Sequence, residues 1–213
     1  MYAGCQGFGT SRHELEFMVR HGVTHMDASL DPGNLDLLRK SREEAAAHGV
    51  ELEMIHIPIA ESITLAEDPQ RDRDLDEICG WIENAGKAGL RGLNYNFSVV
   101  GYQRTAARYG RGGSKFSSFE FAKYDNGEPH KGGRVDRDEI FARAAYFLER
   151  AIPVAEENKV QMASHLPDPP APVLRGEVRW NFPVMDGLKR FSELVDSPYH
   201  GFNFCCGVAA EGL

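Results

Sequence analysis

A glycine followed at once by a short apolar run recurs four times in this chain, in HGVTHM, HGVELEM, AGLRGLNYN and HGFNF. Glycine commonly ends a helix, because it adopts the left-handed backbone conformation without a steric penalty. Each repeat is therefore typical of a helix that stops and is followed directly by a strand. A chain that alternates helices and strands in this way is expected to place its strands in parallel, with the helices as crossover connections.

The apolar patterns around these repeats predict the same alternation. Six strands are expected, over residues 2–6, 23–28, 50–59, 90–100, 160–165 and 201–206. Helices are expected after Ser11, after Asn34, and over residues 72–88, 136–158 and 184–195. Pro153 lies inside the fourth of these helices, where it removes a backbone donor, so we expect it to kink the helix or divide it.

Successive crossovers between parallel strands are right-handed, so such units wind in one direction and tend to close. The predicted fold is therefore an α/β barrel of the TIM type, and an open doubly wound sheet is the alternative. The first strand-to-helix turn, GCQGFGTSR, lacks the GxGxxG spacing of a dinucleotide-binding sheet. We expect residues 1–213 to form one incomplete barrel domain with about six of the eight βα units. Truncation after the sixth strand is favoured over completion of the barrel by another chain.

Residues 101–134 follow neither pattern and are rich in glycine, aromatic and basic residues. Long irregular segments inside a compact domain are usually lids or binding loops. This one follows the fourth expected strand, so it would rise from the catalytic end of a barrel. A mobile surface insertion is the alternative.

The charge balance excludes several classes of function. The 213 residues contain 24 Lys and Arg against 32 Asp and Glu, a net charge of −8, which argues against a broad nucleic-acid footprint. No apolar run approaches the roughly 20 residues of a membrane span, and no secretory signal is visible. Four cysteines do not make a disulfide framework, so we expect a reduced, cytoplasmic protein.

Two side chains that can bind metals end consecutive expected strands. His165 closes the fifth strand and Cys205 the sixth, with one helix between them. Side-chain alternation directs both toward the barrel interior at its catalytic end, and places Cys206 on the opposite face, packed against a helix. An imidazole and a thiolate together suit a divalent transition metal. A structural cysteine and an ordinary hydrogen-bonding histidine are the alternative.

Other polar side chains are expected to face the same interior. Asn94 and Asn96 alternate with apolar residues on the fourth strand, and their amides suit hydrogen bonds to a hydroxylated substrate. Asp27 shares a face of the second strand with His25, as a core hydrogen-bond pair or a substrate contact. His56 ends the apolar part of the third strand and could also face inward.

Three stretches resemble the mannonate dehydratase family, within the xylose-isomerase-like TIM barrels. They are GLNYNFSVVGYQRT, RAAYFLERAIPVAEENKVQMASHLPDPPAPV and LKRFSELVDSPYHGFNFCCG. Their most specific elements are His-x-x-Asp-Pro-Pro, which begins at His165, and Phe-Cys-x-Gly, which contains Cys205. The order of helices and strands agrees over the whole chain.

The resemblance implies a divalent metal bound by His165 and Cys205. Manganese is typical of the family, whereas the thiolate favours zinc or iron. Arg104 matches the active-site arginine of the family, and could grip the substrate carboxylate with two hydrogen bonds. The remaining family ligands, a His and an Asp, and the late acid and base residues come from two further strands and have no counterpart here. Ala60 also departs from the family pattern, which carries a histidine before Glu61.

The implied activity is that of a hydro-lyase in glucuronate catabolism, which converts D-mannonate to 2-keto-3-deoxy-D-gluconate and water. The expected partner is a small sugar acid, bound by Asn96 and Arg104, and a homo-oligomer is left open. A metal-dependent sugar isomerase or epimerase on the same barrel is one alternative, and a catalytically inactive barrel fragment is another. Because half of the implied ligands lack a counterpart, we expect residues 1–213 by themselves to be inactive.

Overall fold

The computed structural model describes residues 2–212 and contains one sheet of six parallel strands. Neighbours in the sheet are also neighbours along the chain, so each crossover leads to the adjacent strand. In order the strands are β1 (Gly4–Phe8), β2 (His25–Ala28), β3 (Glu51–His56), β4 (Gly92–Asn96), β7 (Gln161–His165) and β10 (His200–Asn203). Strands β1 and β10 form the two edges. The predicted parallel α/β architecture is confirmed.

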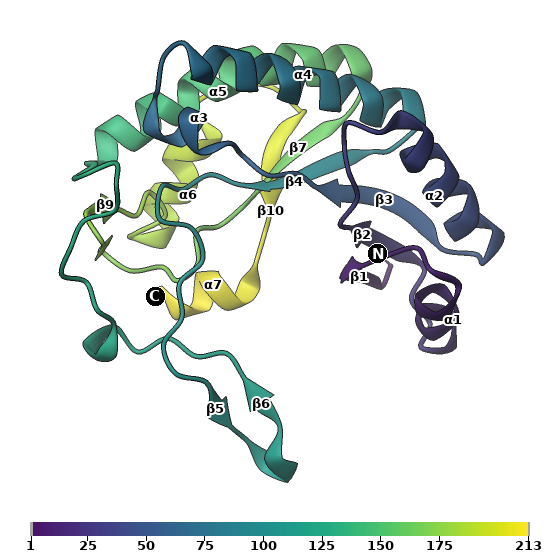
Figure 1. Ribbon diagram of the computed structural model, residues 1–213, viewed down its shortest axis with the longest axis horizontal. Helices are drawn as coiled ribbons and strands as arrows, with labels where there is room; N and C mark the ends of the chain where they lie inside the picture. Colours follow the sequence, from purple (N-terminus) through teal and green to yellow (C-terminus); the bar gives the residue numbers. More distant parts are fainter. Residues whose placement is uncertain (1, 213) are drawn as a thin grey trace.

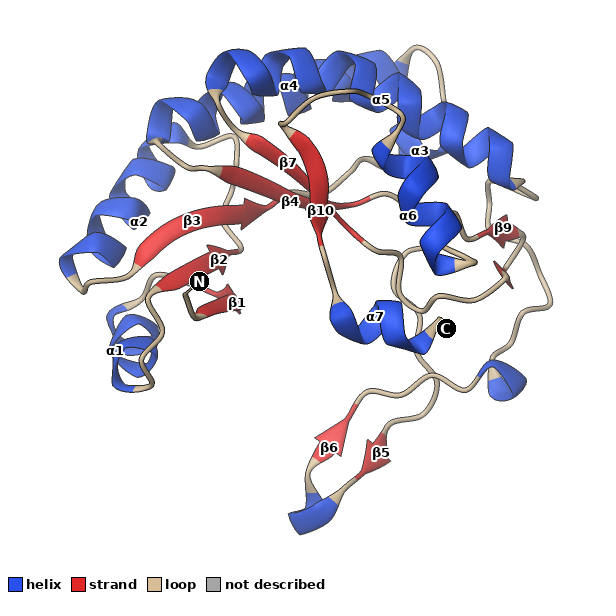
Figure 2. Ribbon diagram, turned by 180° about the vertical axis from the view of Figure 1, so that it is seen from behind, coloured by secondary structure: helices blue, strands red, loops and turns tan. Residues whose placement is uncertain are grey.

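Helices connect the strands and lie along one side of the curved sheet, most visibly α2, α4 and α5 (Figure 1). The same arc appears from behind, with the short α7 on the opposite side below β10 (Figure 2). The helices are α1 (Arg12–Arg20), α2 (Leu35–Ala47), α3 (Glu61–Leu65), α4 (Gln70–Ala88), α5 (Arg137–Asn158), α6 (Val184–Ser192) and α7 (Cys206–Glu211). No helix within residues 2–212 is both long and apolar enough to cross a membrane.

Local capping chemistry sets where the helices begin and end. Ser11 opens α1 with a capping box, in which its side chain accepts from the Glu14 N–H and the Glu14 carboxylate accepts from the Ser11 N–H. Asn34 caps α2 through its side chain alone, with its Oδ1 accepting from the Leu37 N–H at 3.0 Å. Gly89 ends α4 with a φ of 78°, a left-handed conformation that favours glycine. These starts and this stop agree with the sequence prediction.

The face of the sheet that meets the helices carries the apolar core. On and just after β4, Leu93, Tyr95 and Phe97 alternate along the chain and are fully buried. Phe147 of α5 packs against two of these side chains, with ring centroids 5.3 Å from Tyr95 and 5.8 Å from Phe97. The long helix α5 is therefore held to the centre of the sheet by aromatic contacts.

Two local expectations are wrong, and a third is wrong in part. Helix α5 continues through Pro153 without the division that was one of the two expected effects. Pro153 lies on the exposed side, where water can satisfy the carbonyl that it frees. The last strand stops at Asn203, because Cys205 caps α7 and the chain turns away from the sheet. Cys206 therefore begins a helix and is exposed, instead of packing beneath one.

The irregular segment after β4 contains a small hairpin, β5 (Arg108–Tyr109) and β6 (Lys115–Phe116), that extends away from the sheet (Figure 1). It also contains two 3-10 turns, η1 (Arg111–Gly113) and η2 (Phe121–Lys123). A second small hairpin, β8 (Val173–Leu174) and β9 (Glu177–Val178), follows β7 and was not predicted. Two-residue strands are too short to show periodicity, so the sequence pattern could not reveal them.

Replacing Phe147 by Ala should lower the free energy of unfolding by about 3–5 kcal/mol, since it leaves a cavity between α5 and β4. Urea denaturation measures the loss. Phe116→Ala removes the same atoms from the half-exposed strand β6, and should change the free energy by less than about 0.5 kcal/mol. Equal losses in the two variants would contradict the assignment of Phe147 to the core.

Candidate active site

The face of the sheet turned away from the helices is polar. Residues in register on parallel strands point to the same face, and Asn96 lies opposite His165, which in turn lies opposite Asn203. His56 lies opposite Asn94 in the same way. Polar side chains on this interior face include Gln6, Asp27, His56, Asn94, Asn96, His165 and Asn203.

A pocket of about 190 Å³ opens at the carboxyl end of these strands. It is bounded by residues from β1, β3, β4 and β7, so the curvature of the sheet brings distant strands to one cavity. Its lining residues are Gln6, His56, Asn96, Ser98, Gly101, Tyr102, His165, Pro167 and Asp168. The predicted residues Asn96 and His165 therefore share one pocket, at the end of the sheet where barrel enzymes bind substrates.

His165 has the local geometry of a metal ligand. Its Nδ1 lies 2.8 Å from the carbonyl oxygen of Leu166. A carbonyl only accepts hydrogen bonds, so Nδ1 carries the proton and Nε2 keeps its lone pair. Metal-binding histidines are commonly held in this manner by a backbone carbonyl.

Cys205 lies just beyond β10, two residues after Asn203, which pairs with His165. Its sulfur accepts from the Val208 N–H at 3.5 Å and packs partly against the core. It is absent from the lining of the His165 pocket described above. Across residues 2–212, no three His, Cys, Asp or Glu side chains gather as a group that could hold a metal ion. The described residues thus offer two candidate ligands, which is part of a coordination shell.

Arg104 is already engaged by a carboxylate that the sequence analysis did not anticipate. Its Nη1 and Nη2 donate to the two oxygens of Asp168 at 2.8 and 2.6 Å, and Nη1 also donates to the Gln103 carbonyl oxygen at 2.8 Å. The guanidinium also lies over the Tyr102 ring, 3.7 Å from its centroid. Asp168 belongs to the His-x-x-Asp-Pro-Pro element, which was the available signal for this partner.

The remaining edge of the Arg104 guanidinium is free to bind a ligand. Asp168 and Gln103 use both N–H groups of Nη1 and one of Nη2. The Nε–H and the second Nη2–H lie side by side, and neither has a protein acceptor in the part of the chain that the structure describes. Such an edge matches the two oxygens of a carboxylate. Arg104 also borders a second pocket, of about 480 Å³, lined by Ser118, Phe119, Pro169 and Glu211, among others.

A buried acid lies deeper in the interior. Asn94 donates through Nδ2 to Oδ2 of Asp27 at 2.9 Å, and the other side-chain oxygens of both residues are buried without a partner among residues 2–212. Burial raises the pKa of the Asp27 carboxyl. Burial also lowers the pKa of His56, with Asp27 opposing the shift and His165 adding to it. The interior therefore favours neutral forms of both groups.

Replacing Asp27 by Asn should stabilise the protein at neutral pH. The folded-state pKa of Asp27 lies above its unfolded value, so ionisation costs stability once the pH exceeds the unfolded value. The gain should shrink toward acidic pH, where Asp27 is itself protonated. Thermal unfolding at neutral and acidic pH measures the effect. Glu43→Gln is the control, because it removes a charge from the exposed face of α2. A constant difference across pH would contradict the assignment.

Comparison of the sequence with known proteins finds mannonate dehydratases in each case. Residues 130–211 match the family model described as D-mannonate dehydratase. The chain is 28% identical over 214 residues to a mannonate dehydratase of Shouchella clausii, an alignment that covers 81% of this chain and 57% of the relative. It is 31% identical over 199 residues to one of Enterococcus faecalis, covering 78% and 54%. The chain thus spans a little over half the length of these relatives.

Solved structures show the same fold. Mannonate dehydratase from Streptococcus suis serotype 2 has a TM-score of 0.86 at 24% identity, over 99% of this chain and 65% of that one. A D-psicose 3-epimerase from Clostridium cellulolyticum H10 has a TM-score of 0.61 at 13% identity, over 94% and 62%. The predicted TIM-type α/β fold is confirmed. Taken together, these findings show that the chain is similar in sequence to the mannonate dehydratases and shares the fold of a solved one.

Proposed function

We propose that the pocket at the carboxyl end of the sheet belongs to a metal-dependent sugar-acid dehydratase that acts on D-mannonate. The observation that carries the proposal is the free edge of Arg104, which can grip a carboxylate beside the pocket of His165 and Asn96. The relatives named mannonate dehydratase support this substrate class. The products are 2-keto-3-deoxy-D-gluconate and water.

The reaction requires two bonds to break. The proton on C2, next to the carboxylate, is removed, and the hydroxyl on C3 leaves with a proton as water. The enol that remains then becomes the 2-keto acid, so atoms balance without an oxidant. A divalent cation, when bound, supplies positive charge that favours loss of the proton beside the carboxylate.

Each proposed residue has a separate task. Arg104 binds and orients the carboxylate through its Nε–H and Nη2–H edge, while Asp168 holds the guanidinium in place. Asn96 is exposed in the pocket and can hydrogen-bond to sugar hydroxyls. His165 and Cys205 would hold the cation, for which we propose manganese, with zinc or iron as alternatives because a thiolate favours them.

The proposal extends to the partner, the metabolic role and the location of the protein. The proposed partner is a small sugar acid, and the proposed metabolic role is in glucuronate catabolism. The four cysteines are free in the structure, which fits the reducing cytoplasm that we propose as the location.

The activity is tested by incubating the purified protein with D-mannonate and Mn²⁺. A 2-keto acid that depends on His165 and Cys205 supports the dehydratase. An isomer or epimer formed without loss of water would instead support a sugar isomerase or epimerase. Absence of turnover, with no metal binding, would favour a catalytically inactive fragment. Because the described residues supply only two candidate ligands, we expect residues 1–213 by themselves to be inactive.

His165→Asn and Cys205→Ser should each weaken Mn²⁺ binding by at least about tenfold, because each removes a proposed ligand. Titration calorimetry with the metal alone measures this. His13→Asn changes an exposed histidine on α1 and should leave the affinity unchanged. If the His13 variant and the two site variants bind Mn²⁺ alike, the proposed ligands are wrong.

Arg104→Lys should raise the Kd for D-mannonate by about 10- to 100-fold, or about 1.4 to 2.8 kcal/mol, since lysine keeps the charge and loses the paired donors of the guanidinium. Arg111→Lys, on the exposed turn of the small hairpin, is the matched control. Titration calorimetry with D-mannonate compares the two. An unchanged Kd in the Arg104 variant would show that this residue does not bind the carboxylate.

A further inference from the structure

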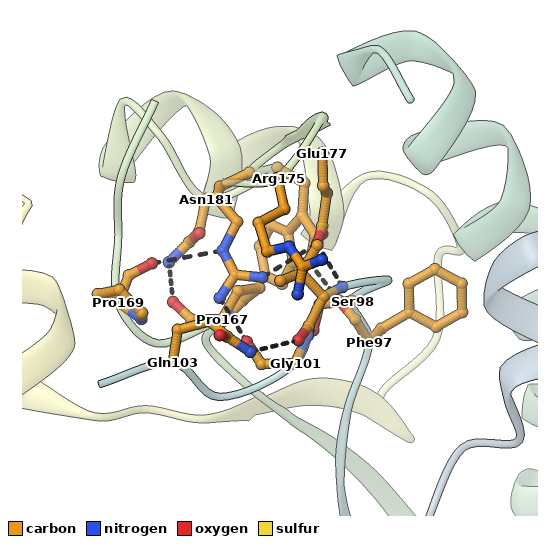
Figure 3. A network of polar contacts seen from close by, with 12 residues as sticks. Phe97, Ser98, Gly101, Gln103, Pro167, Pro169, Arg175, Glu177 and Asn181 are labelled. Carbon is orange, nitrogen blue, oxygen red and sulfur yellow. Dashed lines mark hydrogen bonds and ion pairs between the residues drawn. The ribbon is translucent and has the colours of Figure 1, made fainter. Parts of the chain in front are cut away.

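Side chains from the segment that begins at β9 reach across to the two loops that carry the candidate site (Figure 3). One loop follows β4 and contains Arg104. The other follows β7 and contains Asp168. The side chains that contribute are at most 1% exposed, and they belong to Glu177, Arg179, Trp180 and Asn181. Nearly every hydrogen bond that they make across this interface ends on a backbone atom of a loop.

The loop after β4 is held at three successive points. The Trp180 indole donates to the Phe97 carbonyl oxygen at 2.8 Å. Glu177 accepts from the Val100 N–H at 2.7 Å. Arg179 donates through Nη2 to the Gly101 carbonyl oxygen at 3.0 Å. These contacts fix the backbone immediately before Arg104.

The loop after β7 is held on both sides of Asp168. Asn181 donates through Nδ2 to the Pro167 carbonyl oxygen at 2.8 Å. Arg179 donates through Nε to the Pro169 carbonyl oxygen at 3.4 Å. A single guanidinium therefore bonds to both loops, and its third nitrogen, Nη1, lies 3.1 Å from the Glu177 carboxylate.

Stability alone does not account for this arrangement. Arg179 and Glu177 form an ion pair whose side chains are both 0% exposed. Removing two charges from water is costly, and apolar residues of similar size often replace such a pair without loss of stability. Apolar residues, however, could not make the hydrogen bonds by which this pair contacts two separate loops.

We infer that Arg179, assisted by Glu177 and Asn181, is a positioning residue that sets the distance between the two loops. It thereby holds Asp168 against Arg104, and keeps the free edge of Arg104 aimed at the sugar-acid carboxylate. The inference deepens the proposed function and rests on it for the identity of the ligand. The positioning of Arg104 itself can be measured without any substrate.

Arg179→Met keeps most of the side-chain volume and removes all three donors. We expect the Nε–H resonance of Arg104, followed by ¹⁵N NMR and assigned by its loss in Arg104→Lys, to shift or broaden. We also expect the Kd for D-mannonate, measured by titration calorimetry, to rise by about 10- to 100-fold. Arg179→Lys retains one charge and should give intermediate values.

Ile82→Ala is the control, because Ile82 is fully buried in α4, away from both loops. It should lower the melting temperature and leave the Arg104 resonance and the Kd for D-mannonate unchanged. If Arg179→Met does not fold, Glu177→Gln and Asn181→Leu test the same contacts one loop at a time.

The outcomes distinguish the positioning role of Arg179 from the proposed dehydratase function. An unaltered Arg104 resonance in the folded Arg179 variants, or the same alteration in Ile82→Ala, would overturn the positioning role. A displaced Arg104 resonance in a protein that does not bind D-mannonate would retain that role and overturn the proposed function instead. A rise in Kd together with the displaced resonance supports both.

Discussion

Side-chain alternation on the parallel strands is the constraint on which the rest of this structure depends. Each strand gives one row of side chains to the helices and the other to the interior. On and after β4 the first row is Leu93, Tyr95 and Phe97, fully buried under α5, while the second is Asn94 and Asn96. The same alternation therefore builds the core and lines the pocket. A shift of one residue in register would exchange the two rows, so the apolar packing that stabilises the fold also keeps the polar groups facing inward.

The site itself depends on a second layer of interactions, in the loops at the carboxyl end of the sheet. Arg104 and Asp168 come from different loops, and their two-pronged ion pair is only partly buried. The buried pair of Arg179 and Glu177 lies behind it and bonds to the backbone of both loops. Charges in a low-dielectric interior interact more strongly than exposed ones. The two charges of the inner pair are accordingly expected to interact more strongly, and the outer pair retains donors for a ligand.

Much of the fold was predictable, because it depends on short-range chemistry. The helix starts at Ser11 and Asn34 follow from side chains that cap the backbone of the next turn. The errors have equally specific causes. Pro153 is tolerated within α5 because it lies on the side that faces water, where the carbonyl that it frees can be solvated. Cys206 left the predicted strand because Cys205 caps a helix, a role that cysteine rarely signals.

The sequence by itself determined the parallel α/β fold, the interior direction of Asn96 and His165, and the resemblance to mannonate dehydratases. These depend on periodicity and on local motifs. Tertiary structure alone decided that Arg104 meets Asp168, that Asn94 meets Asp27, and that Arg179 joins two loops. Each of these contacts except the Arg179 contact with Pro169 links residues more than sixty positions apart. The folding of the chain, not any local preference, brings such residues within hydrogen-bonding distance.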